Sequence, residues 1–265
     1  MFDKGQFTFT SRGVENRSAT MALASRDQEY LRECQEQDMP VPPFDRYIYV
    51  LPSHVIKKRL SIGETGYEGH VPDFATLVSR DKNELKALGL VRKYTNIPVP
   101  RILHQGEGFN VFERIQGVTV NEGPIWDRVS PRQREAIRLQ VQGYIKELSA
   151  IPNPTNGISS LVSSGEVFHI QLPERGPFTS TKEFVATYAD HEVLSTIPLD
   201  SQPVFSHLDW DLSNIILHPN LDGVAGVIDW ERACFFPEGG RSIHQMCHQW
   251  DGWEKLFDGL DFPHV

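Results

Sequence analysis

Hydrophobic and polar positions alternate in short runs in the first part of the chain. Residues 46–51 (RYIYVL) and 53–60 (SHVIKKRL) are rich in β-branched and aromatic side chains, and Pro52 separates them. This pattern predicts two strands joined by a tight turn. Residues 81–94 instead repeat apolar side chains at every third position, which predicts a helix that Asp81 is able to cap.

The segments around this helix favour loops and strands. Residues 62–78 contain several glycines and predict a loop before the helix. After it, residues 101–105 and 110–115 predict two strands around a glycine turn. The clearest helix covers residues 130–150, because a capping-box pattern starts at Ser130 and a helical stripe of apolar residues follows.

The second half of the chain places short strands among helices and loops. Apolar runs at residues 203–206, 214–218 and 224–230 predict strands, and residues 180–195 favour a helix. Strands and helices do not alternate regularly, so the sequence predicts the α+β class. The polar residues 1–45 predict a weakly packed arm, partly disordered, with a short charged helix at most.

Composition narrows the function without naming it. The 265 residues hold 26 Lys and Arg against 35 Asp and Glu, and the net charge of −9 argues against general binding of nucleic acid or anionic membranes. No apolar run reaches the length of a membrane helix, and the N-terminus has no apolar signal core. Cys34, Cys234 and Cys247 do not make a disulfide framework, so a cytoplasmic protein is expected. His244, Cys247 and His248 lack the spacing of a structural zinc site.

The segment 205–217 (FSHLDWDLSNIIL) carries the most informative pattern, an H-x-D-x-x-x-x-N formed by His207, Asp209 and Asn214. Asp229 follows at the end of a predicted strand. Phosphoryl transfer from a nucleotide needs one carboxylate to orient and deprotonate the acceptor hydroxyl, and an amide oxygen with a second carboxylate to hold magnesium. These residues have the required types. The alternative interpretation is a turn-capping acid, a buried histidine and a hairpin acid.

These residues resemble the aminoglycoside phosphotransferase family, which has a protein-kinase-like fold. The similarity extends over about residues 46–240 and includes residues 95–100 (TNIPVP) and 111–117 (VFERIQG). Residues 176–178 (GPF), and the IDWE segment with the later Pro237, are similar to the fungal-type branch of the family.

The resemblance implies a two-lobed fold. A polar arm at residues 1–45 would precede a small β-rich N-lobe at 46–115 and a mainly helical C-lobe at 116–265. Relative to the family, the N-lobe and the C-terminus are both expected to be curtailed. No glycine-rich turn precedes the strand of Lys57, and the chain has 36 residues after Asp229.

The resemblance also gives each member of the predicted site a role. These residues are the catalytic Asp209 as base with His207 as its support, the magnesium ligands Asn214 and Asp229, the phosphate-binding Lys57 with its ion-pair partner Glu84, and the backbone from Glu113 to Ile115 at the adenine edge. Lys58 remains an alternative to Lys57, because both lie in a basic run. Glu84 also suits the start of a helix, where an acid is stabilising.

Two functions remain. The first is an ATP- and magnesium-dependent small-molecule kinase that moves the γ-phosphoryl group to a hydroxyl, and the acidic charge favours a cationic acceptor. The second is a kinase-fold protein without turnover that binds a protein partner, since the missing glycine turn bears on nucleotide binding. Protein-kinase activity is disfavoured, because no A-P-E-type segment follows Asp229. No nucleic-acid or membrane partner is expected.

Overall fold

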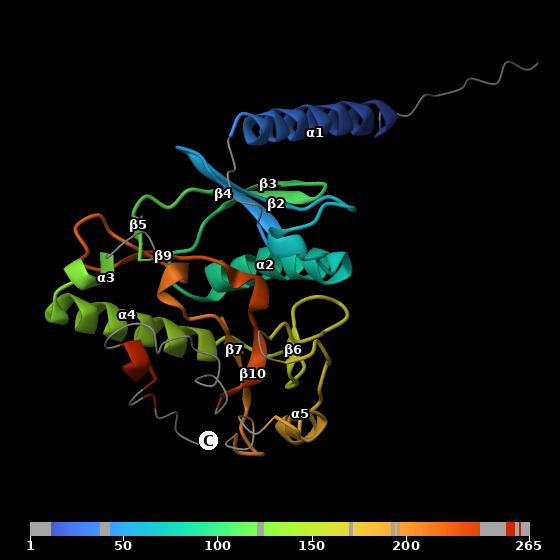
Figure 1. Cartoon of the computed structure of the whole chain (residues 1–265). Coiled ribbons are helices and arrows are strands. Elements are labelled where there is room, and N and C mark those ends of the chain that lie inside the picture. Colours follow the sequence, from blue (N-terminus) through green and yellow to red (C-terminus); the bar gives the residue numbers. More distant parts are fainter. Residues whose placement is uncertain are drawn as a thin grey trace, which may run out of the picture.

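The computed structural model describes residues 12–37, 43–120, 125–169, 172–191, 194, 197–238, 253–257 and 260. Figure 1 shows an upper part, in which a sheet has a helix on each face, and a lower part with α4 and several short strands. The mixed class, with an antiparallel N-terminal sheet and a part richer in helices, is confirmed. We call residues 46–115 the N-lobe and residues 116–265 the C-lobe, and this division stays a prediction.

The N-lobe sheet is antiparallel, in the order β1-β2-β4-β3. Its strands are β1 (Arg46–Val50), β2 (His54–Arg59), β3 (Ile102–Gly106) and β4 (Phe109–Glu113). The predicted hairpin of β1 and β2 is confirmed, and its register sets Ile48 opposite Lys57 and Val50 opposite Val55. Because opposed residues in neighbouring strands share one face of a sheet, all four side chains lie on the same side.

Helix α1 (Arg12–Gln35) covers the other face of this sheet (Figure 1). Cys34 is buried there, Tyr30 packs beside it, and His54 Nε2 of β2 lies 2.8 Å from Glu33 Oε2. These contacts differ from the predicted weakly packed arm. Tyr30 and Cys34 are one helical turn apart, and a contact of one or two turns is too short to give a visible periodic pattern.

Helix α2 (Phe74–Tyr94) packs on the face of the sheet opposite α1 (Figure 1). Asp73 caps its start, accepting hydrogen bonds from two backbone N–H groups at 3.0 and 3.3 Å. The predictions of a loop through residue 78 and of a cap at Asp81 are therefore wrong. Asp81 lies inside the helix, where ion pairs with Arg46 (2.9 Å) and Arg59 (3.1 Å) compensate its burial.

Within the described residues the C-lobe contains three α-helices, several short 3-10 helices and two three-stranded sheets. The α-helices are α3 (Ile125–Arg128), α4 (Pro131–Ser149) and α5 (Thr181–Thr187). One sheet has the order β5 (Val118–Thr119), β8 (Ile215–Leu217) and β9 (Val224–Val227). The other has the order β6 (Ser159–Ser160), β10 (Cys234–Pro237) and β7 (Pro203–Ser206). The predicted capping box at Ser130 is confirmed. Helix α5 ends earlier than predicted. None of the described helices combines the length and apolarity that a membrane span needs.

One hydrophobic core joins α2 to the C-lobe. Leu88 of α2 packs in it together with Ile145 of α4 and with the short helix η4 (Trp230–Arg232) that follows β9. Trp253 is also buried in this core. Because interiors this closely packed resist sliding, the core fixes α2 against η4.

Candidate active site

The predicted catalytic loop, residues 207–214, leaves the end of β7 and closes in the short helix η3 (Leu212–Asn214). We call this segment the catalytic loop below. Hydrogen bonds within the loop fix its shape, since Asn214 Nδ2 donates to the backbone oxygen of Asp209 at 3.0 Å. Leu208 has a φ of 62°, a left-handed conformation that favours glycine. Its side chain is buried, and this burial compensates the strained backbone.

The side chain of His207 connects the catalytic loop to the backbone just before Asp229. Its side chain is fully buried, Nε2 lies 2.9 Å from the backbone oxygen of Ile228, and the backbone N–H of Asp209 donates to Nδ1 at 3.2 Å. A carbonyl accepts and an amide donates, so the ring carries its proton on Nε2. Burial lowers the pKa of His207 to about 4, which keeps the ring neutral. A neutral, enclosed histidine orients the loop rather than exchanging protons.

Asp209 is the carboxylate that the catalytic loop presents. It is only partly buried. Burial, and then the negative charge of Asp229, raise the pKa of Asp209 to about 6. A carboxylate with this pKa is ionised at neutral pH, yet it is a stronger base than an ordinary aspartate. The environment therefore matches the role of a proton acceptor.

The predicted residues Lys57, Glu84 and Asp229, which we call the lysine cluster, come together from three elements. Lys57 Nζ lies 2.7 Å from Glu84 Oε1 of α2 and 2.9 Å from Asp229 Oδ1. Asp229 follows β9 and has a φ of 64°, which turns the chain sharply into η4. The sharp turn brings a carboxylate of the C-lobe against a lysine of the N-lobe sheet.

Burial and charge act in opposite directions in the lysine cluster. Burial raises the pKa of Glu84 to about 7, and the nearby Lys57 only partly counteracts it. For Asp229 burial also favours the neutral form, but Lys57 and Arg46 hold its pKa down at about 2. The pKa of Lys57 is raised, because both carboxylates outweigh the effect of burial. Asp229 and Lys57 therefore stay charged at neutral pH.

The structure distinguishes Lys57 from its alternative. Lys58 points to the other face of the sheet, where its Nζ lies 5.2 Å from the ring centre of Tyr47. The face of Lys57 also carries Ile48 and Val50, whose residues are 42% and 56% exposed. We call them the apolar roof. Our sequence reasoning missed the roof, although the two-residue alternation from Lys57 and the hairpin register together reveal it.

Glu113 and Ile115 lie where the N-lobe sheet continues into the C-lobe. The Glu113 side chain is engaged by Arg101, at 2.8 and 3.0 Å, on the surface. Its backbone is thus the part left for the predicted adenine contact. Ile115 packs against Gly226 of β9, where a Cβ atom would lie only 2.2 Å from its Cδ1. A larger residue at position 226 would therefore require the end of the Ile115 side chain to move.

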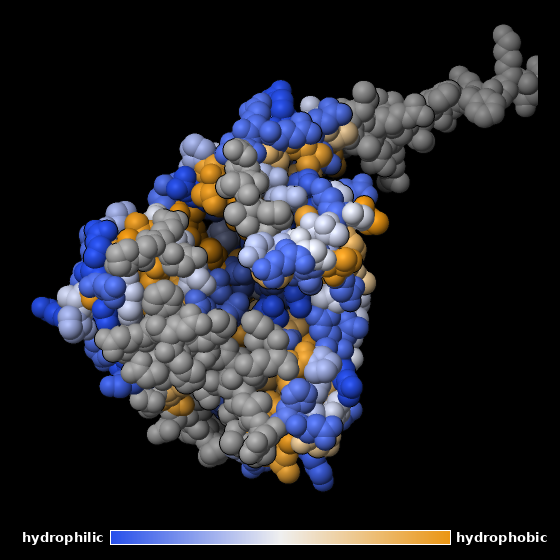
Figure 2. Space-filling view, in the orientation of Figure 1, coloured by the Kyte–Doolittle hydropathy of each residue, from blue (hydrophilic) through white to orange (hydrophobic). Residues whose placement is uncertain are grey.

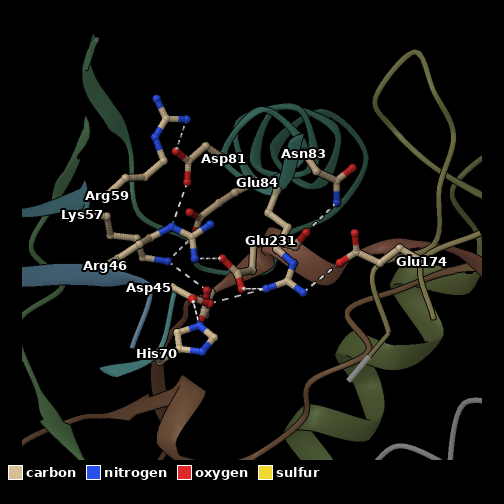
Figure 3. Close-up of polar contacts among 12 residues, drawn as sticks. Asp45, Arg46, Lys57, Arg59, His70, Asp81, Asn83, Glu84, Glu174 and Glu231 are labelled. Carbon is tan, nitrogen blue, oxygen red and sulfur yellow. Dashed lines mark hydrogen bonds and ion pairs between the residues drawn. The ribbon is translucent and has the colours of Figure 1, made fainter. Parts of the chain in front are cut away.

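A second ion network that we had not predicted lies beside the lysine cluster (Figure 3). Arg46 of β1 binds Asp81 of α2 at 2.9 Å and Glu231 of η4 at 2.6 Å. Arg80 continues the network to Glu174 at 2.9 Å. No local pattern indicates these pairs, because their members are far apart in the sequence.

Two hollows lie near these networks. Figure 2 shows hydrophilic residues lining a recess at the junction of the upper and lower parts of the molecule. A cavity of about 400 Å³ lies at the start of α2, and none of the predicted site residues lines it. Its lining residues are Asp45, His70, Asp73, Thr76, Leu77, Arg80 and Glu174.

The donor set suits magnesium, which prefers oxygen ligands and binds through one or two carboxylates together with substrate phosphates. The amide nitrogen of Asn214 is engaged by Asp209, which leaves its oxygen as the ligand atom. The side chain of Asp229 is 35% exposed. Among the described residues no three His, Cys, Asp or Glu side chains are grouped to hold a metal. The cluster of His244, Cys247 and His248 lies outside them.

An antiparallel N-terminal sheet followed by a part richer in helices, with a lysine held between two carboxylates where they meet, is the arrangement of the kinase-like fold class. The sequence model of the phosphotransferase enzyme family matches residues 82–237, more than half of the chain. The chain therefore belongs to this family. No curated protein matches it. The comparisons give no support for the fungal-type branch.

Solved structures share the fold at low identity. APH(2")-IIa in complex with gentamicin is 14% identical with a TM-score of 0.50, over 89% of this chain and 74% of that chain. The ternary complex of APH(2")-IIa with streptomycin and ATP is 15% identical with a TM-score of 0.50, over 83% and 73%. The ADP-bound aminoglycoside phosphotransferase APH(2'')-Ib is 15% identical with a TM-score of 0.50, over 82% and 72%.

Proposed function

We propose that this protein is a magnesium-dependent kinase that transfers the γ-phosphoryl group of ATP to a hydroxyl of a small molecule. The observation that carries the proposal is Lys57 held between Glu84 and Asp229, next to the Asp209 loop. A buried ammonium group is costly unless carboxylates pair with it. Held there by two carboxylates, it suits a phosphate-binding site.

Asp209 acts on the acceptor. It accepts the hydroxyl proton while the acceptor oxygen bonds to the γ-phosphorus and the bond from that phosphorus to the bridging oxygen of the diphosphate breaks. The raised pKa of Asp209, about 6, lets it take this proton near neutral pH. His207 holds the loop in place through its two backbone hydrogen bonds.

Lys57 and the two metal ligands act on the nucleotide. An ammonium group has three N–H donors, and Glu84 and Asp229 take two of them. The third donates to an α- or β-phosphate oxygen. Asn214 and Asp229 would hold magnesium, which supplies positive charge that stabilises the phosphate oxygens. The predictions for Asn214 and Asp229 rest on their type and on the donor set described above.

The base of the nucleotide lies beneath the apolar roof of Ile48 and Val50, with its edge toward the backbone of Glu113 to Ile115. Exposed apolar side chains that lie next to each other are a feature of ligand-binding grooves. Neighbouring structures carry ATP, ADP or GDP, so adenine and guanine are both tested below. The turn at Pro52 offers no glycine for a phosphate loop, and Lys57 therefore supplies more of the phosphate binding.

The acceptor is proposed to be cationic. The net charge of −9 attracts amine-bearing molecules. The fold neighbours bind gentamicin, streptomycin and kanamycin, which makes these three compounds the first acceptors to test. The fungal-type branch and the cytoplasmic location stay predictions from the sequence.

The test measures the thermal midpoint of unfolding with and without excess Mg-ATP and Mg-GTP. A ligand at about 100 times its Kd adds about 2.7 kcal/mol, a rise of a few degrees. We expect this rise in the wild type and in Asp222→Asn, which changes an exposed turn acid in the same way, and its loss in Asp229→Asn. Phosphorylation of the three acceptors is then measured by release of ADP or GDP.

The alternative function is a kinase-fold binding protein without turnover, favoured by the glycine-free turn at Pro52. It predicts no midpoint rise with either nucleotide. A rise in the wild type that Asp229→Asn retains in full would contradict the proposed site while leaving nucleotide binding established.

A further inference from the structure

Asn83 lies on α2 directly before Glu84, and its side chain is completely buried. Its Nδ2 donates to the backbone oxygens of Glu231 at 2.9 Å and Ala233 at 2.7 Å. Its Oδ1 accepts the backbone N–H of Leu161 at 2.8 Å. Figure 3 shows Asn83 on α2, with its amide directed at the segment of Glu231.

Only an amide of this size satisfies the three partners. Two of them are carbonyls that need donors, and the third is an N–H that needs an acceptor. A carboxylate would face the two carbonyl oxygens, and an apolar side chain would leave three buried backbone groups without partners. The contact therefore specifies this residue type and one relative position of α2 and η4.

The two segments that Asn83 joins both carry members of the lysine cluster. Glu84 is the next residue on α2, and Asp229 immediately precedes η4. Arg46 makes a parallel connection, from Asp81 on α2 to the side chain of Glu231. Lys57 can bind both carboxylates only if the distance between these segments is fixed.

We propose that Asn83 is a positioning residue that sets the spacing of Glu84 and Asp229, so that Asp229 is held ready for magnesium. This inference rests on the proposed function. Asn83 touches neither substrate nor metal and acts through η4. The lysine cluster is consequently assembled before any ligand binds, because its spacing is fixed by contacts within the protein.

The test is the coupling between magnesium and ATP, measured by isothermal titration as the ratio of the Kd for ATP in EDTA to the Kd in saturating magnesium. Asn83→Asp keeps the shape of the side chain and removes both donors. The matched control is Gln142→Glu on α4, the same amide-to-acid change at a buried residue whose Nε2 binds Leu256. We expect the ratio to fall about tenfold in Asn83→Asp, as for residues that orient metal ligands, and less than twofold in the control.

A second variant guards against misfolding. Asn83→Ser leaves one hydroxyl donor and is combined with Glu84→Gln in a double-mutant cycle on the same ratio. Residues that act through one spacing give non-additive effects. We expect the ratio in the double variant to lie within twofold of the ratio in the more strongly affected single variant. Additive losses, equal losses in Asn83→Asp and Gln142→Glu, or failure of both Asn83 variants to fold would each overturn the inference. If wild-type ATP binding shows no dependence on magnesium, the proposed function itself is wrong.

Discussion

The two sides of the candidate site are held together differently. Hydrogen bonds within the catalytic loop join near neighbours, since the bond of Asn214 to Asp209 spans five positions and that of Asp209 to His207 spans two. His207 ties the loop to Ile228, 21 positions away. The lysine cluster is held across the chain. Lys57 lies 27 positions from Glu84 and 172 positions from Asp229.

This difference predicts which substitutions change turnover alone and which also change stability. The contacts of the loop are hydrogen bonds to backbone groups, each worth about 1 kcal/mol. The contacts of the lysine cluster are charged and largely buried, and removal of one partner leaves the other unpaired at a cost of several kcal/mol. Substitutions in the loop should therefore change turnover while the fold remains, whereas substitutions in the lysine cluster should change both.

The largest effect is expected for Asp209→Asn. An amide cannot accept the hydroxyl proton, and a positioned base contributes about 10² to 10⁴ in rate. Turnover of the acceptor, measured by phosphate transfer from ATP, should fall by about 10³, and the Kd for Mg-ATP should stay within about threefold. Asp222→Asn is the control and should keep full turnover. Wild-type turnover in Asp209→Asn would remove Asp209 from the mechanism.

The same variant should be more stable than the wild type. The pKa of Asp209 is raised to about 6 from 3.8, so the folded protein binds its proton more tightly than the unfolded chain. The contribution of Asp209 to stability therefore falls as pH rises from about 4 to about 6, and stays lowered above that. At pH 7 Asp209→Asn should gain about 1–2 kcal/mol, seen as a higher thermal midpoint, and the gain should vanish below pH 4. A lower midpoint at pH 7 would contradict this account of the loop.

The next largest effect is expected for Lys57→Met, which leaves two carboxylates facing each other. Unfolding by denaturant should show a loss of about 3 kcal/mol, together with loss of Mg-ATP binding. The lowered pKa of Asp229 stabilises the fold above its ordinary value of 3.8, and this gain disappears as pH falls toward 2. It should be absent at all pH values in Lys57→Met.

Lys58→Met is the matched control, on the same strand but on the opposite face of the sheet. It should lose much less stability and keep nucleotide binding, because Lys58 is not placed between buried acids. Equal losses in the two variants would show that the strand, and not the lysine cluster, carries the effect.

The local or remote origin of each contact also decides what the sequence could predict. Asp209 and Asn214 belong to one short motif, and a capping pattern marks the start of the helix after Ser130. The motif and the helix could therefore be predicted from neighbouring residues. Lys57 and Glu84 could be paired only through the family resemblance. Asn83 could not be found, because its partner Glu231 lies 148 positions away.

Contacts between distant parts of the chain also explain the two wrong predictions, the start of α2 and the packing of α1. The start of α2 was misplaced because the glycine-rich segment before it favours a loop, and because Asp81 resembles a cap when Arg46 is not yet known to face it. Helix α1 was underestimated because, among its side chains that the structure describes, only a few contact the sheet. In both cases the contacting residues belong to another helix or strand, and the pattern of neighbouring residues does not indicate them.

The smallest effect is expected for Arg101→Ala, which breaks an ion pair that is as short as those of the lysine cluster but lies on the surface. Arg101 Nε is 2.8 Å from Glu113 Oε2, with the two side chains 66% and 36% exposed. Water replaces a lost partner at such a site, so the thermal midpoint should not change measurably. The Kd for Mg-ATP should also stay within about twofold, because the proposed adenine contact uses the backbone of Glu113. A tenfold loss of affinity in Arg101→Ala would instead place the Glu113 side chain in the nucleotide site. Burial alone would then not distinguish the charged residues that bind the nucleotide from those that do not.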